Sequence, residues 1–114
     1  MQPDVAHAGG ISEVRRIAAL AESRDILIAP HCPLSPVALA ASLHLDAACP
    51  NFFLQEHVTL GESLLKDPFV IEAGYIKVPE RPGLGIELDE EKLTAGQFDG
   101  VWEVPRFKIG RAHV

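Results

Sequence analysis

The fold is decided by one short stretch of the chain, which reads ILIAPHCPLSP from residue 26 to residue 36. Its first four residues, 26–29, form an uninterrupted apolar run, which is typical of a parallel strand buried on both faces. Pro30 and Pro33 then end the strand. Ser35 and Pro36 are residue types preferred at the N-cap and first position of a helix. The stretch therefore predicts a strand, a loop and a helix, in that order.

The residues before this stretch predict a helix over residues 10–23. Apolar side chains recur there at helical spacing, at Ile11, Val14, Ile17, Ala18 and Ala21. Gly9 and Gly10 mark a turn, and Ser12 is the expected N-cap.

The residues after it predict a second helix and a second strand. Residues 35–48 are apolar on nearly all sides of a helix, which indicates deep packing. Residues 51–55 form the next strand candidate. Helices and strands that alternate with short links are typical of parallel βα units, so strands 26–29 and 51–55 should be parallel neighbours.

The second half of the chain follows a different pattern. Residues 69–78 alternate roughly and predict a hairpin, residues 79–85 are rich in proline and glycine, and residues 89–93 predict a short capped helix. Residues 106–114 show no helix or strand pattern. Residues 109–114 match the translation of a common sequencing adapter, so we expect an artefact there, with a natural tail as the alternative.

Composition excludes several classes of protein. The 114 residues suit one domain, with 47% hydrophobic and 23% charged residues. A net charge of −6 and the lack of a basic run argue against nucleic acid or an anionic membrane as partner. No apolar stretch approaches the roughly 18 residues of a membrane span, and no signal peptide is visible. Two cysteines, Cys32 and Cys49, are expected to be free thiols in the cytoplasm.

Three polar residues lie where predicted strands end: Asp4, His31 and Glu56. Their spacing of 27 and then 25 residues is about one βα unit, so they should be neighbours around a sheet or barrel. An Asp can orient an imidazole and raise its basicity, and such a His can act as a general base. A second carboxylate can contact the substrate. The alternative is that all three are solvated loop residues.

The other candidate side chains carry weaker signals. His7 could cap a loop or reach Asp4, His44 falls within an apolar helix, and His57 is ambiguous. Cys32 has proline neighbours and no helix N-terminus, which argues against an activated thiol. The chain has no CxxC pair and no HExxH motif, so the sequence predicts no metal site of that kind.

Three segments resemble the acid-sugar dehydratases of the enolase superfamily, in its mandelate racemase branch. They read QPDVAHAGGI at residues 2–11, APHCPL at residues 29–34 and FLQE at residues 53–56. Residues 75–79 and 82–86 resemble that group's return to the capping domain. The resemblance covers roughly residues 2 to 95.

The resemblance implies an α/β fold, namely the C-terminal portion of a (β/α)8 TIM-type barrel. Residues 1–60 would be its last βα units, residues 61–95 a segment packing toward the capping domain, and residues 96–114 an irregular tail. A complete barrel needs about 250 residues. The capping domain and the earlier strands are therefore expected before residue 1.

The resemblance also implies the chemistry. His31 matches the base at the end of the seventh strand, Asp4 its dyad partner on the sixth, and Glu56 a substrate-contacting carboxylate on the eighth. The family reaction removes the proton α to a carboxylate and expels the β-hydroxyl, giving a 2-keto-3-deoxy acid. It uses Mg²⁺, which stabilises the enediolate. The family's acidic Mg²⁺ ligands and the histidine that protonates the leaving group would lie upstream.

Several expectations follow from the resemblance. Galactonate is the favoured substrate, with gluconate, mannonate or another sugar acid as alternatives, and the whole enzyme should be a homo-oligomer. This chain alone should be inactive, and poorly soluble or molten. A non-catalytic half-barrel module is the rival hypothesis, and it would need polar edges where other strands are lost.

Overall fold

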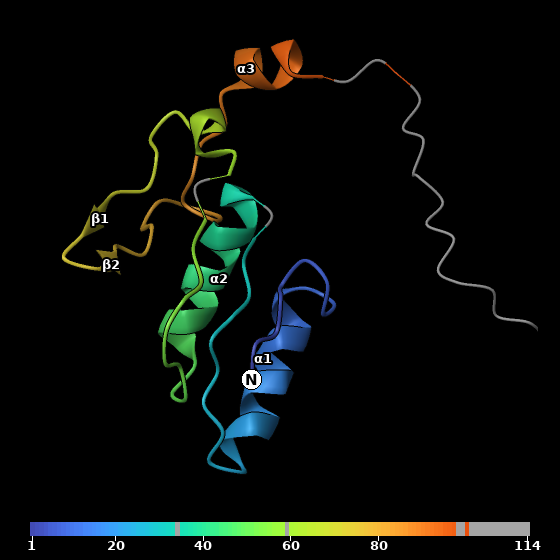
Figure 1. Cartoon of the computed structure of the whole chain (residues 1–114), viewed down its shortest axis with the longest axis vertical. Coiled ribbons are helices and arrows are strands. Elements are labelled where there is room, and N and C mark those ends of the chain that lie inside the picture. Colours follow the sequence, from blue (N-terminus) through green and yellow to red (C-terminus); the bar gives the residue numbers. More distant parts are fainter. Residues whose placement is uncertain (34, 59, 98–99, 101–114) are drawn as a thin grey trace, which may run out of the picture.

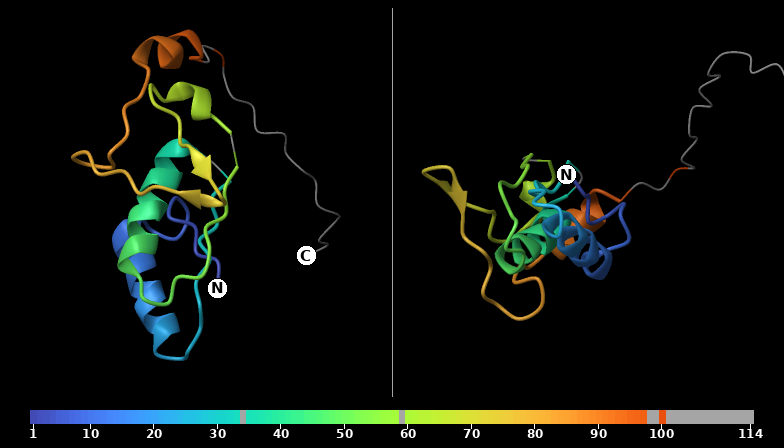
Figure 2. Two further views of the ribbon diagram at one scale, coloured as in Figure 1. Left: turned by 90° about the vertical axis from the view of Figure 1, so that its left-hand side faces the viewer. Right: turned by 90° about the horizontal axis from the view of Figure 1, so that it is seen from below.

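The computed structural model describes residues 1–33, 35–58, 60–97 and 100. In chain order its elements are α1 (Ile11–Glu22), α2 (Pro36–Ala48), the 3-10 turn η1 (Glu62–Leu64), β1 (Ile71–Glu72), β2 (Tyr75–Ile76) and α3 (Glu90–Ala95). Helices α1 and α2 lie side by side, the β1–β2 hairpin lies on one side of α2, and α3 lies at one end (Figures 1 and 2). Most of the expected tail, including residues 109–114, lies outside the described residues.

Helix α2 begins where its sequence signals predict. The Ser35 side chain accepts a hydrogen bond from the Ala38 amide at 3.2 Å, and Pro36 occupies the first turn. Most of the helix is buried, as expected from its apolar sequence: Pro36, Leu39, Ala40, Ala41, Ser42, Leu43, Leu45 and Asp46. The prediction of a helix over residues 35–48 is therefore confirmed to within one residue.

Helix α1 also matches its predicted range, but its N-cap was predicted wrongly. The cap is Gly10, with no side-chain hydrogen bond, and Ser12 lies inside the first turn. Gly9 and Gly10 have φ values of 100° and 86°, which glycine adopts without strain. These two residues turn the chain into the helix, and the Gly10 carbonyl accepts the Val14 amide at 3.0 Å.

Extended segments pair in parallel beside these helices. Ile28 bridges Phe52, with Ile28 N–H donating to Asn51 O and Phe53 N–H donating to Ile28 O, both at 2.9 Å. This confirms that segments 26–29 and 51–55 are parallel neighbours.

The segment at residues 28–31 also pairs on its other side with residues 1–4. A parallel bridge joins Asp4 and His31, and His31 N–H donates to Pro3 O at 3.1 Å. Three strand ends therefore lie next to one another.

These segments form isolated bridges rather than the continuous strands that were predicted. The physical reason is proline. In a regular parallel ladder, alternate residues each donate one amide and accept one. Pro3 and Pro30 have no N–H, so each removes a rung.

The helices cover one face of the paired segments. Ala18 and Ala21 of α1 pack with Ile28 and Cys49, and Phe52 lies against this cluster. On the opposite side, Leu27 and Phe53 are 52% and 64% exposed. The paired segments therefore have one helix-covered face and one open apolar face.

Apolar residues in and around the β1–β2 hairpin pack against α2. Phe69, Ile76 and Val78 contact the cluster of Cys32, Leu39 and Leu43. The predicted hairpin is confirmed, with Ala73 and Gly74 at positive φ in its turn. The predicted short helix is confirmed as α3, whose cap Asp89 accepts the Lys92 amide at 3.2 Å.

In the described part of the chain no helix is both long and apolar enough to cross a membrane.

Candidate active site

Asp4 and His31 form the centre of the candidate site. The parallel bridge between them places both side chains at the same edge of the paired segments, and Asp4 Oδ2 lies 2.9 Å from His31 Nδ1. Asp4 is only 8% exposed, whereas the His31 side chain is 44% exposed. A buried carboxylate therefore holds an imidazole that solvent can reach.

Asp4 is held in its ionised form. Burial acts to raise its pKa, but hydrogen bonds from His31, the Ala6 amide and His7, with the charge of His7 nearby, outweigh burial and keep that pKa below its ordinary value. The Ala6 amide donates to Oδ1 at 2.8 Å, and His7 Nδ1 lies 3.2 Å from Oδ2. Because an ionised carboxylate can only accept, Nδ1 of His31 carries the hydrogen, and in the neutral imidazole Nε2 is the nitrogen with the free lone pair.

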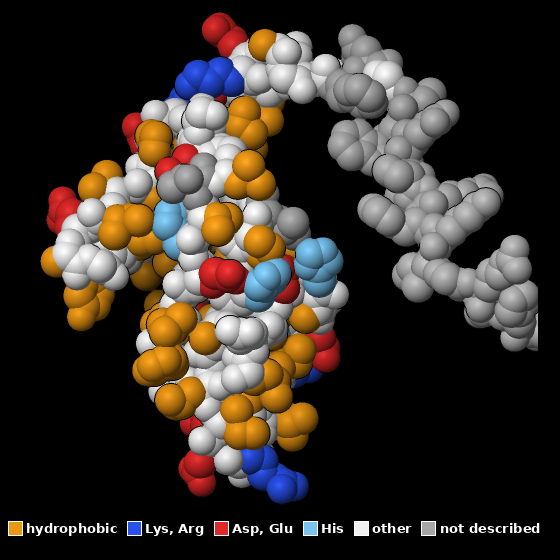
Figure 3. Space-filling view, viewed as in Figure 1, with side chains coloured by type: hydrophobic (Ala, Val, Ile, Leu, Met, Phe, Trp, Pro, Cys, Tyr) orange, Lys and Arg blue, Asp and Glu red, His pale blue; other side chains and the backbone are white. Residues whose placement is uncertain are grey.

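Glu56 completes the group on the other side of the imidazole. Its Oε2 lies 3.6 Å from His31 Nε2 and accepts the backbone amide of Cys32 at 3.0 Å. The structure thus brings together all three residues that the sequence placed at strand ends. Acidic and histidine side chains gather in the middle of one face of the molecule, above a cluster of hydrophobic side chains (Figure 3).

The other candidates have structural surroundings of their own. His7 is exposed and contacts Asp4, which was one of the two alternatives predicted for it. His44 Nε2 lies 3.3 Å from the Leu84 carbonyl, and the largely buried His57 lies 3.1 Å from Glu62. None of these contacts involves His31.

Cys32 is not arranged as a nucleophile. Its thiol is buried, and burial, with the negative charges of Asp4, Glu56 and Asp46, raises its pKa to about 11. A thiol with that pKa holds almost no thiolate at neutral pH. Its contribution to the site is its backbone N–H, which could not be predicted from the sequence because every residue type except proline has one.

The residues that the structure describes do not fit a Mg²⁺ site by themselves. Mg²⁺ requires near-octahedral oxygen ligands. Both oxygens of Asp4 already accept N–H donors, and Glu56 Oε2 accepts the Cys32 amide. Across residues 1–33, 35–58, 60–97 and 100, no group of three or more His, Cys, Asp or Glu side chains could hold a metal ion. The Mg²⁺ expected from the family resemblance stays a prediction about residues outside this chain.

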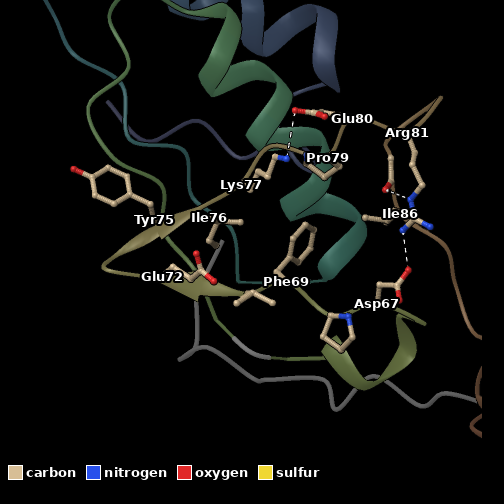
Figure 4. Close-up of a pocket in the computed structure, with 13 residues that line it drawn as sticks. Asp67, Phe69, Glu72, Tyr75, Ile76, Lys77, Pro79, Glu80, Arg81 and Ile86 are labelled. Atoms are coloured by element: carbon tan, nitrogen blue, oxygen red, sulfur yellow. Dashed lines mark hydrogen bonds and ion pairs between the residues drawn. The ribbon is translucent and has the colours of Figure 1, made fainter.

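A separate cavity of about 540 Å³ lies beside the hairpin. Arg81 and Asp67 pair across its edge at 3.1 Å, and Lys77 lies 3.6 Å from Glu80 (Figure 4). None of Asp4, His31 and Glu56 lines it. The cavity is therefore distinct from the candidate active site.

The site combines a buried carboxylate, an imidazole and a second carboxylate at adjacent ends of parallel segments. This arrangement, on an α/β framework, is suited to acid–base chemistry. Comparison with known proteins identifies the family. The model of the enolase C-terminal domain-like family matches residues 1–92, and the chain belongs to that family. The resemblance to the enolase superfamily that the sequence suggested is thereby confirmed.

Curated relatives are described as D-galactonate dehydratases. The protein from Variovorax paradoxus is 50% identical over 82% of this chain, and that from Cronobacter sakazakii is 49% identical over 95% of it. The chain spans only 27% and 31% of the lengths of these two relatives.

Solved structures agree with this assignment. A mandelate racemase/muconate lactonizing enzyme from Jannaschia sp. CCS1 matches with a TM-score of 0.80 and 36% identity, over 89% of this chain and 27% of its own. An enolase from Agrobacterium radiobacter, solved with sodium and L-malate bound, matches with a TM-score of 0.77 and 34% identity, over 96% of this chain and 33% of its own. These likenesses support an α/β enolase-superfamily fold.

Proposed function

We propose that this chain carries the proton-abstracting end of an acid-sugar dehydratase whose substrate is D-galactonate. The observation that carries the proposal is the orientation of His31. Asp4 holds Nδ1 at 2.9 Å, which directs the Nε2 lone pair toward the open side of the site and Glu56. The two D-galactonate dehydratases, at 50% and 49% identity, support this substrate.

The proposed reaction begins with proton transfer. His31 Nε2 takes the proton α to the substrate carboxylate, and the electron pair moves into the carboxylate to give an enediolate. Asp4 stabilises the imidazolium that forms, because its charge lies against Nδ1. Loss of the β-hydroxyl as water and tautomerisation then give a 2-keto-3-deoxy acid. The proton for the leaving hydroxyl would come from an acid outside this chain.

Glu56 is assigned to substrate contact rather than to proton removal. It lies beside Nε2, where the reacting carbon would be, and the Cys32 amide fixes its orientation. We assign it to the substrate carboxylate or the enediolate that forms from it.

We propose that the active enzyme is a larger protein of which this chain is a part. The open apolar face, with Leu27 and Phe53 exposed, fits the interior of a (β/α)8 barrel of which residues 1–60 form the last units. Residues 61–95 would pack toward a capping domain, and the complete enzyme would be a cytoplasmic homo-oligomer that uses Mg²⁺. A non-catalytic half-barrel is less well supported, because it would need polar edges where other strands are lost, and because a free-standing module should not expose such an apolar face.

A chimeric enzyme tests the proposal. Residues 1–97 of this chain replace the matched part of the Variovorax paradoxus relative, and the product is assayed for exchange of the α-proton with deuterium and for dehydration. Activity on D-galactonate that His31→Asn removes is the expected result. A folded chimera that is inactive on D-galactonate, D-gluconate and D-mannonate alike would refute the proposal. If the chimera instead prefers D-gluconate or D-mannonate, the proposed substrate is wrong but the proposed reaction stands.

A further inference from the structure

We propose that Gln55 is a positioning residue that holds Glu56 beside His31. Its side-chain Nε2 donates to the Pro30 carbonyl at 3.0 Å and to the Glu56 carbonyl at 2.7 Å. The first carbonyl belongs to the residue directly before His31, and the second belongs to Glu56 itself. One amide group therefore ties together the strand ends that carry His31 and Glu56. The catalytic meaning of this clamp rests on the proposed function.

The clamp lies where the ladder between the two segments is broken. The bridge between Ile28 and Phe52 sets a register in which Pro30 N would next donate to Phe53 O, and Gln55 N would donate to Pro30 O. Pro30 has no N–H and cannot form the first of these bonds. The Pro30 carbonyl instead accepts from Glu56 N at 3.3 Å, one residue further along.

This one-residue shift decides where Glu56 points. Successive side chains in an extended segment point to opposite faces, so an extra residue changes the side on which the following side chain lies. Glu56 lies on the side of His31, with Oε2 3.6 Å from Nε2 and 3.0 Å from the Cys32 amide nitrogen. In a regular ladder the backbone N–H of Gln55 would donate to the Pro30 carbonyl. Here the side chain of Gln55 donates to it instead.

The chemistry requires a hydrogen-bond donor at this position, and glutamine supplies one. Both partners are carbonyl oxygens, which only accept, so a group with two N–H hydrogens is needed to serve both. A carboxylate would place a negative oxygen between two carbonyls. A thioether of similar length would leave both carbonyls without this donor.

Amide hydrogen exchange tests the clamp without relying on catalysis. The chimera is compared with its Gln55→Glu and Gln55→Met variants, and Gln97→Glu is the matched control because Gln97 is exposed and far along the chain. The measured quantity is the exchange rate of the Cys32 amide relative to that of Ile28, whose amide bonds to Asn51 in the same sheet. Release of Glu56 should raise this ratio about tenfold in both Gln55 variants, within the strength of two ordinary hydrogen bonds. Gln97→Glu should leave it unchanged.

A second measurement connects the clamp to catalysis. The kcat for α-proton exchange should fall about tenfold in the Gln55 variants, with a smaller change in KM. An unchanged Cys32-to-Ile28 ratio in either folded variant would overturn the proposal, even with a lowered melting temperature, because uniform destabilisation speeds both amides alike. If the unsubstituted chimera is inactive, the proposed function fails, whereas the exchange ratio still decides whether Gln55 holds Glu56.

Discussion

His31 and Asp4 are 27 residues apart in the sequence, yet Nδ1 of one lies 2.9 Å from Oδ2 of the other. They meet because the backbone pairs the segments that carry them, and the bridge falls on these two residues themselves. The imidazole is therefore oriented by backbone register as well as by its hydrogen bond.

Replacing the proposed base should abolish both partial reactions together. In the chimera, His31→Asn is expected to lower α-proton exchange and dehydration by at least about 10²-fold, the low end for a positioned acid–base group. The melting temperature should change little, because His31 is partly exposed. His44→Asn is the control, since His44 lies against the Leu84 carbonyl and away from Asp4, His31 and Glu56 among the described residues. Retained exchange with a lowered melting temperature would mean that His31 has only a structural role.

Asp4→Asn should give a loss comparable to or milder than that of His31→Asn. The amide removes the charge that stabilises the imidazolium and can present N–H to Nδ1, which favours the wrong tautomer. The kcat for exchange is the quantity to measure, with Asp67→Asn as the control for a carboxylate paired elsewhere. Full activity in Asp4→Asn would contradict the orientation argument.

Glu56→Gln should affect substrate binding more than proton removal. Gln keeps an oxygen that can accept the Cys32 amide, so the local geometry should survive. We expect a raised KM or weaker binding of a sugar-acid inhibitor, with exchange still detectable. Complete loss of exchange at saturating substrate would instead assign Glu56 to the proton transfer.

Asp46 should make stability depend on pH in a direction unusual for a carboxylate. Burial raises its pKa from 3.8 to about 7, and neither carboxylate oxygen has a hydrogen-bond partner among the described residues. Between about pH 4 and 7 the folded chain keeps a proton that the unfolded chain releases. Stability should therefore fall as pH rises through this window, by up to roughly 1.4 kcal/mol per pH unit, and level off above it.

Asp46→Asn in the chimera should remove this slope and raise the melting temperature most at pH 7 to 8. Glu22→Gln, an exposed carboxylate at the end of α1, is the control. Identical melting curves for Asp46→Asn and the unsubstituted chimera across pH 5 to 8 would show that another part of the enzyme neutralises Asp46.

The isolated chain should be poorly soluble or molten. Leu27 and Phe53 expose apolar surface on the open face, and no other described segment pairs with the outer edges of the extended segments. Strong binding of a hydrophobic dye with a broad thermal transition is expected. A monomeric product with a cooperative melt and no dye binding would contradict this.

Features set by local chemistry were predictable from the sequence, and those set by pairing were less so. Ser35 and Pro36 define the start of α2 because capping needs only neighbouring residues. The residues at strand ends were found because βα units have a regular length. The interruption at Pro30 depends on which amide faces which carbonyl, and this requires the register. The Cys32 amide and the Gln55 clamp depend on the same non-local information.

Register also sets which changes in length evolution can accept at this site. The loop at residues 5–10 between the first segment and α1 can absorb an insertion, because the pairing of Asp4 with His31 is fixed on either side of it. An insertion of one residue between Met1 and Asp4 would turn the carboxylate to the opposite face. In related sequences, variation in length should therefore collect in the loops and helix ends, while the spacing within each paired segment stays constant.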